Sequence, residues 1–411
     1  MSNDFRKRIL VLSAESGLGH KSAAEALQSA FQIKFGDGVT VEIINPLDHP
    51  ETPKFLRDSQ SNYDEIVKKL PEIYKFGYEI SDWELPVSLL EGGLIVAMYE
   101  AFREIVLEYT PDLVVSAYPL YAAPLSTVLE LNDLPKIPIV TSITDLVSVH
   151  QVWFNTNVTL LTVPTEDVFE DARQAGFSED QLLLTGIPVK PEIGKLQETD
   201  KATIRKELGW EINKPTALAV ASPRVTNLKT YLKDLDNLGI DFQWAIVAGG
   251  NDPLYEALNR IKWQHAAKVY NFVEEMPKFL RASDLIICKA GGLITTESLA
   301  AGLPILFIQA LPGQETGNVE YVIGHQAGAF CENSAEICEK FSDWFVNDGE
   351  ILKTMAHNAK VLGKPNAALE IATASWELID ESPSTSITIE DTHRLHGLNA
   401  LLEVFDIKPQ L

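Results

Sequence analysis

The architecture of the chain is indicated first by one stretch, Ile9-Leu-Val-Leu-Ser-Ala-Glu-Ser-Gly-Leu-Gly-His20. A short apolar, β-prone run ends at Ser13, a turn with Gly17 and Gly19 follows, and a segment with helical spacing comes next. That segment places five small or apolar residues on one face: Ala23, Ala26, Leu27, Ala30 and Phe31. A strand, a glycine turn and a helix in this order are typical of α/β domains.

The same alternation continues on both sides of the middle of the chain. The further short apolar runs of the first half are Val41–Ile44, Leu113–Ser116, Ile139–Ser142 and Leu160–Val163. Those of the second half are Ala217–Ala221, Trp244–Val247, Leu285–Cys288 and Ile305–Ile308. Continuous apolar strands separated by helices predict parallel sheets covered on both faces. We therefore expect an α/β protein with two doubly wound, Rossmann-like domains that face each other across a cleft.

A polar segment divides the two halves. Lys190–Pro215 is rich in charges and contains two prolines and two glycines after Lys190, a composition typical of a linker with one short helix. The expected domains are residues 1–190 and 191–382. Residues 383–411 are expected to form an appendage, to which the sequence assigns no role.

Composition narrows the function classes. The 411 residues carry a formal net charge of −24, and both halves are acidic, which disfavours nucleic-acid binding. The most apolar stretch, Leu85–Phe102, is interrupted by Glu91 and Glu100 and falls short of the ~18–20 clean apolar residues of a bilayer span. The first eight residues lack a signal-peptide core. We expect a cytoplasmic protein with at most a weak peripheral contact with the inner face of the cell membrane.

The three cysteines have no metal-ligand spacing and form no even disulfide framework. They are Cys288, Cys331 and Cys338. Reduced thiols are therefore expected.

The first glycine turn is a candidate ligand site. Glycines allow close backbone approach, and a helix N-terminus offers free N–H groups. Ligands of open α/β sheets bind at the carboxyl ends of the strands, where His20 lies. The spacing is not the dinucleotide fingerprint, and no acidic ribose partner ends the next strand. The alternative, that His20 only caps the helix, stays open.

Two further segments carry polar groups at strand ends. In Ile286-Ile-Cys-Lys-Ala-Gly-Gly-Leu-Ile-Thr-Thr-Glu-Ser298, a strand runs into a glycine turn; Lys289 suits a phosphate and Glu297 a ribose hydroxyl pair. The loop Leu311-Pro-Gly-Gln-Glu-Thr-Gly-Asn318 presents Gln, Glu and Asn together, as sugar recognition requires. A tight structural turn and a solvated loop are the respective alternatives.

Taken together and in order, these segments resemble one known family, over roughly Arg8 to Phe330. The blocks are Gly17-Leu-Gly-His-Lys21; Ile143-Thr-Asp-Leu146 with His150, Trp153-Phe154, Pro164-Thr-Glu166 and Gly186-Ile-Pro-Val189; and Ile287-Cys-Lys-Ala-Gly291 through Pro312-Gly-Gln-Glu315 and Gly317-Asn318. The chain is similar to the monogalactosyldiacylglycerol synthases and the bacterial processive diacylglycerol glucosyltransferases. More distantly, it resembles the transferases that add N-acetylglucosamine to the peptidoglycan lipid intermediate.

The resemblance implies a GT-B fold and transfer of galactose or glucose from a UDP-sugar to diacylglycerol or a similar lipid, by single displacement with inversion. His20 is then the catalytic base, and no metal or cofactor is needed beyond the UDP-sugar as co-substrate. The acceptor is expected near Asp145, His150 and Trp153. Asn271-Phe-Val-Glu-Glu-Met276 resembles the family's uracil-binding segment. The expected donor-binding residues are Gly17, Gly19, Arg224, Phe272, Val273, Lys289, Ala290, Gly291, Gly292, Thr295, Glu297, Gln314, Glu315 and Asn318.

Two features depart from the family pattern. Where the family has a glycine-rich loop, this chain reads Ala219-Val-Ala-Ser-Pro-Arg-Val-Thr-Asn227, with Arg224 offering a charged contact to phosphate instead. The segment Asn62–Trp83 is rich in aromatic residues; it fits either an apolar membrane contact or the domain core. The alternative functions are transfer to a polyprenyl lipid or soluble acceptor, and a GT-B-shaped binding protein that has lost catalysis.

Overall fold

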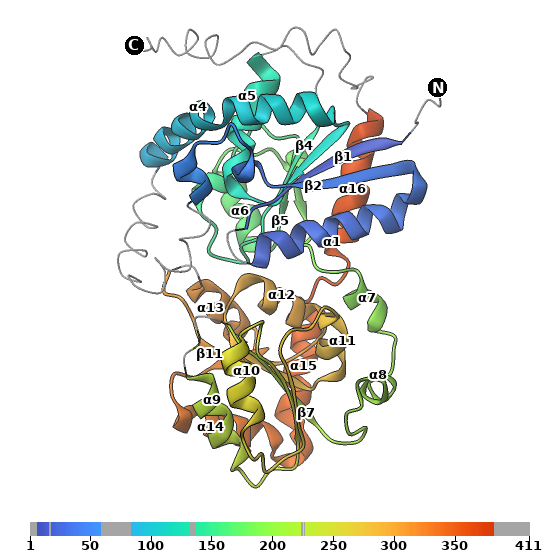
Figure 1. The fold of residues 1–411 in the computed structure, drawn as a ribbon, viewed down its shortest axis with the longest axis vertical. Coiled ribbons are helices and arrows are strands. Elements are labelled where there is room, and N and C mark those ends of the chain that lie inside the picture. Colours follow the sequence, from blue (N-terminus) through green and yellow to red (C-terminus); the bar gives the residue numbers. More distant parts are fainter. Residues whose placement is uncertain are drawn as a thin grey trace. The chain divides into compact units, whose positions relative to one another are not determined.

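The structure is a computed structural model that describes residues 6–15, 18–58, 84–131, 137–222, 225, 227–313 and 315–381, with the backbone alone at 18, 84–90, 380 and 381. Within these residues the chain forms two compact units, coloured along the sequence in Figure 1. The first combines the chain up to Lys190 with a segment that starts at Asn366. The second is Pro191–Pro365.

A six-stranded parallel sheet forms the centre of the first unit, in the order β2-β1-β3-β4-β5-β6. Its strands are β1 (Lys7–Leu12), β2 (Val39–Ile44), β3 (Leu113–Ser116), β4 (Ile139–Ser142), β5 (Leu160–Val163) and β6 (Leu182–Leu184). Strands β3, β4 and β5 are buried along their whole length, because helices cover both faces of the sheet.

Each face of this sheet has its own core. Leu10 and Leu12 of β1 pack on the side of α4 (Glu84–Tyr109), α5 (Ala122–Leu131) and α6 (Glu166–Gln174). Ile9 and Val11 point the other way, toward α1 (Leu18–Phe35) and α16 (Ala367–Glu381). This alternation follows from the two-residue period of a strand.

No described helix is both long and apolar enough to cross a membrane.

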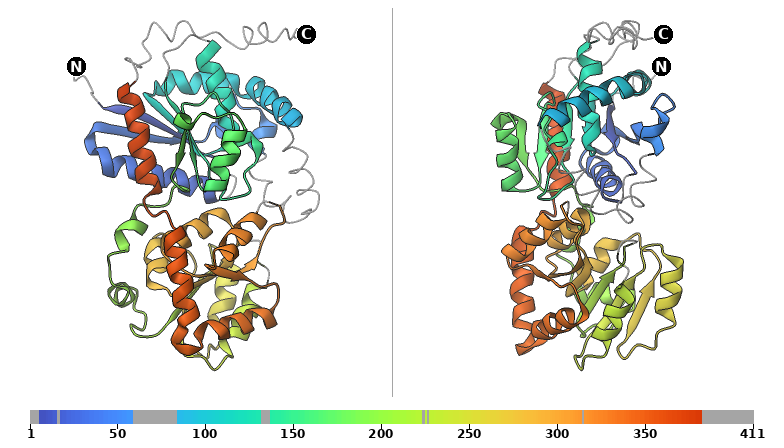
Figure 2. Two further views of the ribbon diagram at one scale, coloured as in Figure 1. Left: turned by 180° about the vertical axis from the view of Figure 1, so that it is seen from behind. Right: turned by 90° about the vertical axis from the view of Figure 1, so that its left-hand side faces the viewer.

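Helix α16 returns to the first unit after the chain has completed the second. It packs beside α1, where the rings of Phe35 and Trp376 stack with centroids 4.0 Å apart. Ile371 and Ala372 are fully buried in the same core. Figure 2 shows α16, in red, against the sheet of the first unit. The sequence predicts a second domain of residues 191–382, whereas the structure places this helix in the first unit.

The second unit is also built on a six-stranded parallel sheet, in the order β12-β11-β10-β7-β8-β9. Its strands are β7 (Thr216–Val220), β8 (Gln243–Val247), β9 (Ala267–Tyr270), β10 (Leu285–Lys289), β11 (Ile305–Gln309) and β12 (Gly328–Phe330). Its helices are α7 (Glu192–Leu196), α8 (Lys201–Leu208), α9 (Leu228–Asp236), α10 (Asp252–Asn259), α11 (Met276–Ala282), α12 (Gly292–Ala300), α13 (Thr316–Gly324), α14 (Ser334–Phe345) and α15 (Glu350–Leu362).

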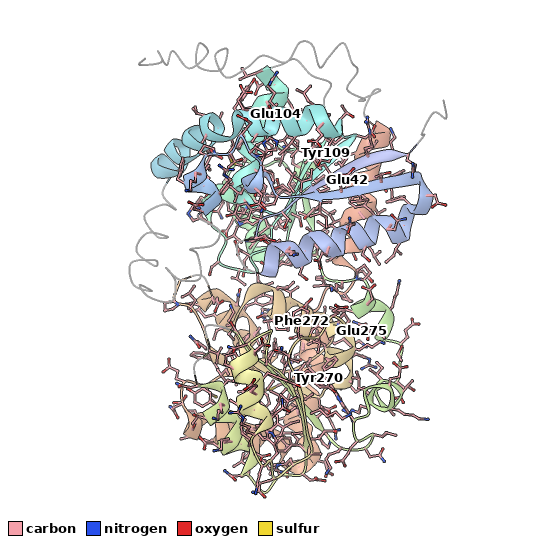
Figure 3. All side chains as sticks on the ribbon, viewed as in Figure 1. Glu42, Glu104, Tyr109, Tyr270, Phe272 and Glu275 are labelled. Carbon is pink, nitrogen blue, oxygen red and sulfur yellow. The ribbon has the colours of Figure 1, made fainter. Side chains whose placement is uncertain are left out.

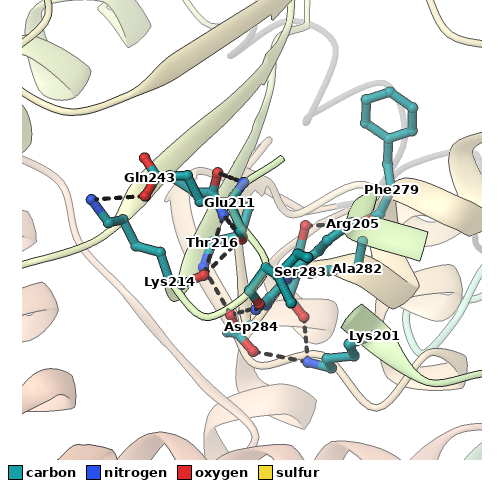
Figure 4. Close-up of polar contacts among 11 residues, drawn as sticks. Lys201, Arg205, Glu211, Lys214, Thr216, Gln243, Phe279, Ala282, Ser283 and Asp284 are labelled. Carbon is teal, nitrogen blue, oxygen red and sulfur yellow. Dashed lines mark hydrogen bonds and ion pairs between the residues drawn. The ribbon is translucent and has the colours of Figure 1, made fainter. Parts of the chain in front are cut away.

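A polar network at the amino ends of these strands ties α8 to the sheet (Figure 4). The Asp284 carboxylate pairs with Arg205 at 2.5 Å and with Lys201 at 3.0 Å, and it also accepts a hydrogen bond from the backbone N–H of Thr216. The side-chain amide of Gln243, at the start of β8, donates hydrogen bonds to the backbone carbonyl oxygens of Glu211 and Lys214. The charged segment whose composition is typical of a linker is thereby held at the amino ends of the strands, and the glycine turns lie at the opposite, carboxyl ends.

The described cysteines are free thiols. Burial raises the pKa of the Cys288 thiol, and it raises that of Cys331 to about 11, so both are neutral at physiological pH.

Candidate active site

His20 lies in the first turn of α1, just past the carboxyl end of β1. A Cβ atom added at Gly19 would have no other atom within 4 Å, so this glycine leaves open space beside the helix start. Gly17 falls outside the described residues. Among the described residues of this turn, Gly19 leaves room beside the backbone.

The contacts of His20 fix its tautomer. Its Nδ1 lies 3.0 Å from the carbonyl oxygen of Ala117 and 2.8 Å from the hydroxyl oxygen of Thr144. A carbonyl oxygen only accepts hydrogen bonds, so Nδ1 carries the hydrogen. In the neutral ring, Nε2 is then the unprotonated nitrogen, which is the form that a general base requires.

Aromatic rings surround the imidazole. Tyr118 meets it edge-on with centroids 4.9 Å apart, and Trp153 lies at 6.4 Å. Burial lowers the pKa of His20, and the negative charge of Asp145 opposes this effect without overcoming it. The ring is therefore neutral at physiological pH and available as a proton acceptor.

Of the three residues expected near the acceptor, Asp145 and Trp153 lie near this histidine, and the three differ in exposure. Asp145 is half-buried and accepts a hydrogen bond from the indole N–H of Trp153 at 2.8 Å. Trp153 itself is only 1 % exposed. His150 is buried, and its Nδ1 accepts from the backbone N–H of Val152, capping a short helical turn. Two of the three residues thus support the fold, and Asp145 retains partial access to solvent.

In the second unit, the segment expected to meet uracil follows β9. Phe272 is 62 % exposed, unusually open for an aromatic ring, and Val273 is half-buried. Figure 3 shows Phe272 in the second unit with Tyr270 and Glu275, its neighbours in sequence. An exposed ring beside backbone groups leaves a flat surface on which a base can stack.

Lys289 and Glu315 form an ion pair. Lys289 ends β10, and Glu315 immediately precedes α13. The ammonium group donates to Oε1 of Glu315, whose Oε2 accepts from the backbone N–H of Leu311 at 2.9 Å. The Glu315 side chain is 6 % exposed and that of Lys289 is 20 % exposed. Lys289 is thus the more accessible partner, and Glu315 is engaged at both oxygens.

The glycine turn after β10 is compact. A Cβ atom at Gly291 would lie 2.9 Å from the ammonium nitrogen of Lys289, so a side chain there would displace the lysine. Gly292 is half-buried and begins α12. Thr295 donates to the carbonyl oxygen of Gly291 at 2.7 Å.

The other expected donor residues of this unit lie deeper. Ala290 is fully buried, and its carbonyl oxygen accepts from the Asn318 amide at 2.9 Å. Glu297 is 6 % exposed and Asn318 is 3 % exposed. The amide oxygen of Asn318 makes no hydrogen bond within the described residues.

Arg224 and Gln314 fall outside the described residues. Thr144 and Leu311 stand in segments quoted from the sequence, which gives neither a role, and no sequence motif includes Ala117. The contact of Thr144 with His20 spans 124 residues, and no local pattern indicates it.

Comparison with known proteins identifies the family. A model of monogalactosyldiacylglycerol (MGDG) synthase matches residues 20–189, and a model of the glycosyltransferase family 28 C-terminal domain matches residues 227–343. The chloroplastic MGDG synthase 3 of Arabidopsis thaliana is 33% identical over 380 residues, which cover 89% of this chain and 80% of the relative. The chain belongs to the monogalactosyldiacylglycerol synthase family. MGDG synthase of Spinacia oleracea is 30% identical, over 91% of this chain and 73% of the relative.

Solved structures agree on the fold of this MGDG synthase family member. MurG of Acinetobacter baumannii has a TM-score of 0.58 at 17% identity, over 90% of this chain and 99% of that one. UDP-GlcNAc 2-epimerase of Neisseria meningitidis, bound to UDP-GlcNAc, has a TM-score of 0.56 at 16% identity, over 90% and 100%. The fold is GT-B, which transferases and epimerases share. The family assignment makes this chain a UDP-sugar-dependent glycosyltransferase.

Proposed function

We propose that the protein transfers a hexose, galactose or glucose, from a UDP-sugar to diacylglycerol or a similar membrane lipid. The names of the curated relatives support galactose and diacylglycerol. The observation that carries the chemistry is the tautomer of His20, whose Nδ1–H faces a carbonyl oxygen and whose Nε2 is left as a proton acceptor. The alternatives are a polyprenyl lipid or a soluble acceptor.

The reaction is a single displacement. Nε2 of His20 takes the proton of the acceptor hydroxyl as its oxygen forms a bond to the anomeric carbon of the sugar. The bond from that carbon to the diphosphate oxygen breaks on the opposite side, so the configuration inverts and UDP leaves with the electron pair. Burial keeps the imidazole neutral before the transfer, and the nearby charge of Asp145 favours the imidazolium that forms.

The candidate contacts to a diphosphate lie within the second unit. Lys289 offers a charge at the end of β10, and Gly291 and Gly292 open the backbone at the N-terminus of α12. Glu315 holds the lysine in place through the ion pair, so a bound diphosphate shares the ammonium group with a carboxylate. The sugar then contacts the same loop. The reaction in this proposal uses no metal or cofactor.

The protein meets its lipid by a weak peripheral contact on the cytoplasmic face of the membrane. The net charge of −24 opposes binding to anionic lipid, so the contact is apolar. The segment Asn62–Trp83, which we expect to supply that contact, lies outside the described residues.

The test is product analysis with vesicles that contain diacylglycerol. The purified full-length protein is supplied with UDP-galactose or UDP-glucose, UDP release is measured, and the lipid product is identified by mass and anomeric configuration. His20→Ala is expected to lower turnover by about 10²–10⁴-fold with little change in UDP affinity. His325→Ala is the matched control, since His325 also bonds a carbonyl through Nδ1 but is exposed on α13's C-terminal end.

Each arm has an adverse outcome. Turnover of His20→Ala within a few-fold of wild type would show that His20 is not the catalytic base. UDP release without a glycosylated diacylglycerol would move the acceptor to the polyprenyl or soluble class. Loss of turnover in a chelator, restored by a divalent cation, would show that the metal-free mechanism is wrong.

A further inference from the structure

Within the described residues, the nitrogen of His20 that faces the protein has no carboxylate partner. Histidine bases are commonly oriented by a carboxylate or a backbone carbonyl on the ring nitrogen that faces away from the reaction. Here the two atoms near Nδ1 are the Ala117 carbonyl oxygen at 3.0 Å and the Thr144 hydroxyl oxygen at 2.8 Å. Among the described residues, Asp145 makes no hydrogen bond to His20, and its Oδ2 bonds the indole of Trp153 at 2.8 Å.

We propose that Thr144 is the positioning residue of the base, and that its hydroxyl replaces the carboxylate that would otherwise orient His20. The proposal rests on the proposed role of His20 and adds a division of labour between consecutive residues. Thr144 contacts the ring and fixes its orientation. Asp145, held by Trp153, acts on the ring through its charge alone.

The fold makes both acceptors rigid. Ala117 follows β3 and Thr144 follows β4, and these strands are paired in the sheet. Thr144 is 8 % exposed, and its β-branched side chain has restricted rotamers. Two acceptors on one N–H hold the imidazole plane against rotation, so Nε2 keeps one direction. They also stabilise the imidazolium after proton transfer, because Nδ1 remains a donor in that form.

Few other charged or titratable groups of the described residues lie near the ring. Tyr118 presents its ring edge and Asp145 its charge. On the α1 side, Lys21 and Glu15 lie 3.8 Å from each other and are exposed. Neither Lys21 nor Glu15 contributes to the shift in the pKa of His20. Among the described residues of the first unit, the hydrogen bond of Thr144 can therefore be removed without breaking an ion pair of His20.

The experiment compares three variants of the full-length protein in the vesicle assay. Thr144→Val removes the hydroxyl at constant shape, and Thr144→Ser restores it. Thr141→Val is the control: Thr141 is a buried threonine of β4 whose hydroxyl has no partner within the described residues. We expect Thr144→Val to lower kcat/KM about tenfold, with the KM for UDP-sugar unchanged. Thr144→Ser should stay within about threefold of wild type, and Thr141→Val should match wild type.

Two readouts separate positioning from a structural role. In Thr144→Val, the acidic limb of the pH profile should move to lower pH, because the imidazolium has lost an acceptor and is protonated less readily. Independently of activity, ¹⁵N spectra of labelled histidines, assigned with His20→Asn, should show Nδ1–H in wild type and in Thr144→Val, because the Ala117 carbonyl remains, with the Nδ1 resonance shifted in Thr144→Val by loss of the second acceptor. Thermal melting identifies a variant that fails to fold, in which case the serine variant and the wild-type spectrum decide.

The proposal is overturned if Thr144→Val keeps the wild-type pH profile and the wild-type Nδ1 resonance, or if serine fails to rescue a folded protein. A wild-type spectrum with hydrogen on Nε2 also overturns it. Activity retained by His20→Ala would instead refute the base itself, and the spectra would still report on the Thr144 contact.

Discussion

Adding one methyl group at position 291 is expected to weaken nucleotide binding without unfolding the protein. In Gly291→Ala, the new Cβ would lie 2.9 Å from the ammonium nitrogen of Lys289, 3.3 Å from its Cε and 3.7 Å from Oε1 of Glu315. The first distance is too short for a non-bonded contact. The backbone needs no change, because Gly291 has φ −71° and ψ 144°, which alanine adopts readily. The lysine tip must therefore move.

The size of the effect follows from what the lysine loses. To reach ordinary van der Waals distance, the ammonium must retreat by roughly 0.5–1 Å. A hydrogen bond to a charged group contributes about 1.5–3 kcal/mol, and a displaced one loses part of that. We expect about 1.4 kcal/mol, which is a tenfold rise in the Kd for UDP. Loss of glycine at the N-cap of α12 costs about 1 kcal/mol of stability at most.

Calorimetry of UDP binding and thermal melting measure the two effects separately. Gly239→Ala is the matched control, since a Cβ there would meet no atom within 4 Å and both the affinity and the melting temperature should stay unchanged. An unchanged Kd for UDP in folded Gly291→Ala, with Lys289→Met also neutral, would show that Lys289 does not bind the diphosphate. The reasoning from the glycine turn to phosphate would then fail.

Three further outcomes are expected. Burial lowers the pKa of His20, so the imidazole is protonated less readily in the folded protein than in the unfolded chain. The neutral imidazole therefore contributes to the free energy of unfolding above the ordinary pKa of about 6.5, and that contribution is lost as pH falls through the folded pKa. Wild type should therefore lose more free energy of unfolding than His20→Gln on acidification, in paired denaturant titrations, and equal losses would contradict the shift. Asp284→Asn should lower the free energy of unfolding by about 2–3 kcal/mol, since it weakens a network around Arg205, which is 7 % exposed, without altering the Kd for UDP. Liposome flotation should show weak binding that added salt reduces little; binding abolished by salt would indicate a basic patch.

Most of the sheets were predictable from the sequence, for a physical reason. Strands buried on both faces have continuous apolar sequences, so β3, β4 and β5 match the expected ranges. The other expected strands differ by one or two residues at their ends. The missed strands are the short β6 and β12 and the edge strand β9. In β9 one residue is exposed and the others are half-buried, and no apolar run marks it.

The candidate site was predictable where chemistry and local pattern coincide. His20 and Lys289 follow apolar strands at glycine turns, and each of these signals lies within a dozen residues. The pairing of Lys289 with Glu315 spans 26 residues, and the contact of Thr144 with His20 spans 124. Such contacts depend on which strands become neighbours in the sheet, and no local spacing records that. Residue exposure is equally hidden, which is why Trp153 and Glu297 prove more buried than a ligand contact suggests.

The late return of α16 has a consequence for how the protein is made. The second unit, Pro191–Pro365, is one continuous segment, whereas the first lacks α16 until Asn366 and the residues after it have been synthesised. At about 5–20 residues per second, the ribosome needs roughly 10–35 s to translate the intervening stretch. Throughout that time, Phe35 and its neighbours on α1 have no Trp376 to cover them. The nascent chain therefore exposes an apolar surface of the kind that chaperones bind. The second unit, although translated later, can complete its folding before the first.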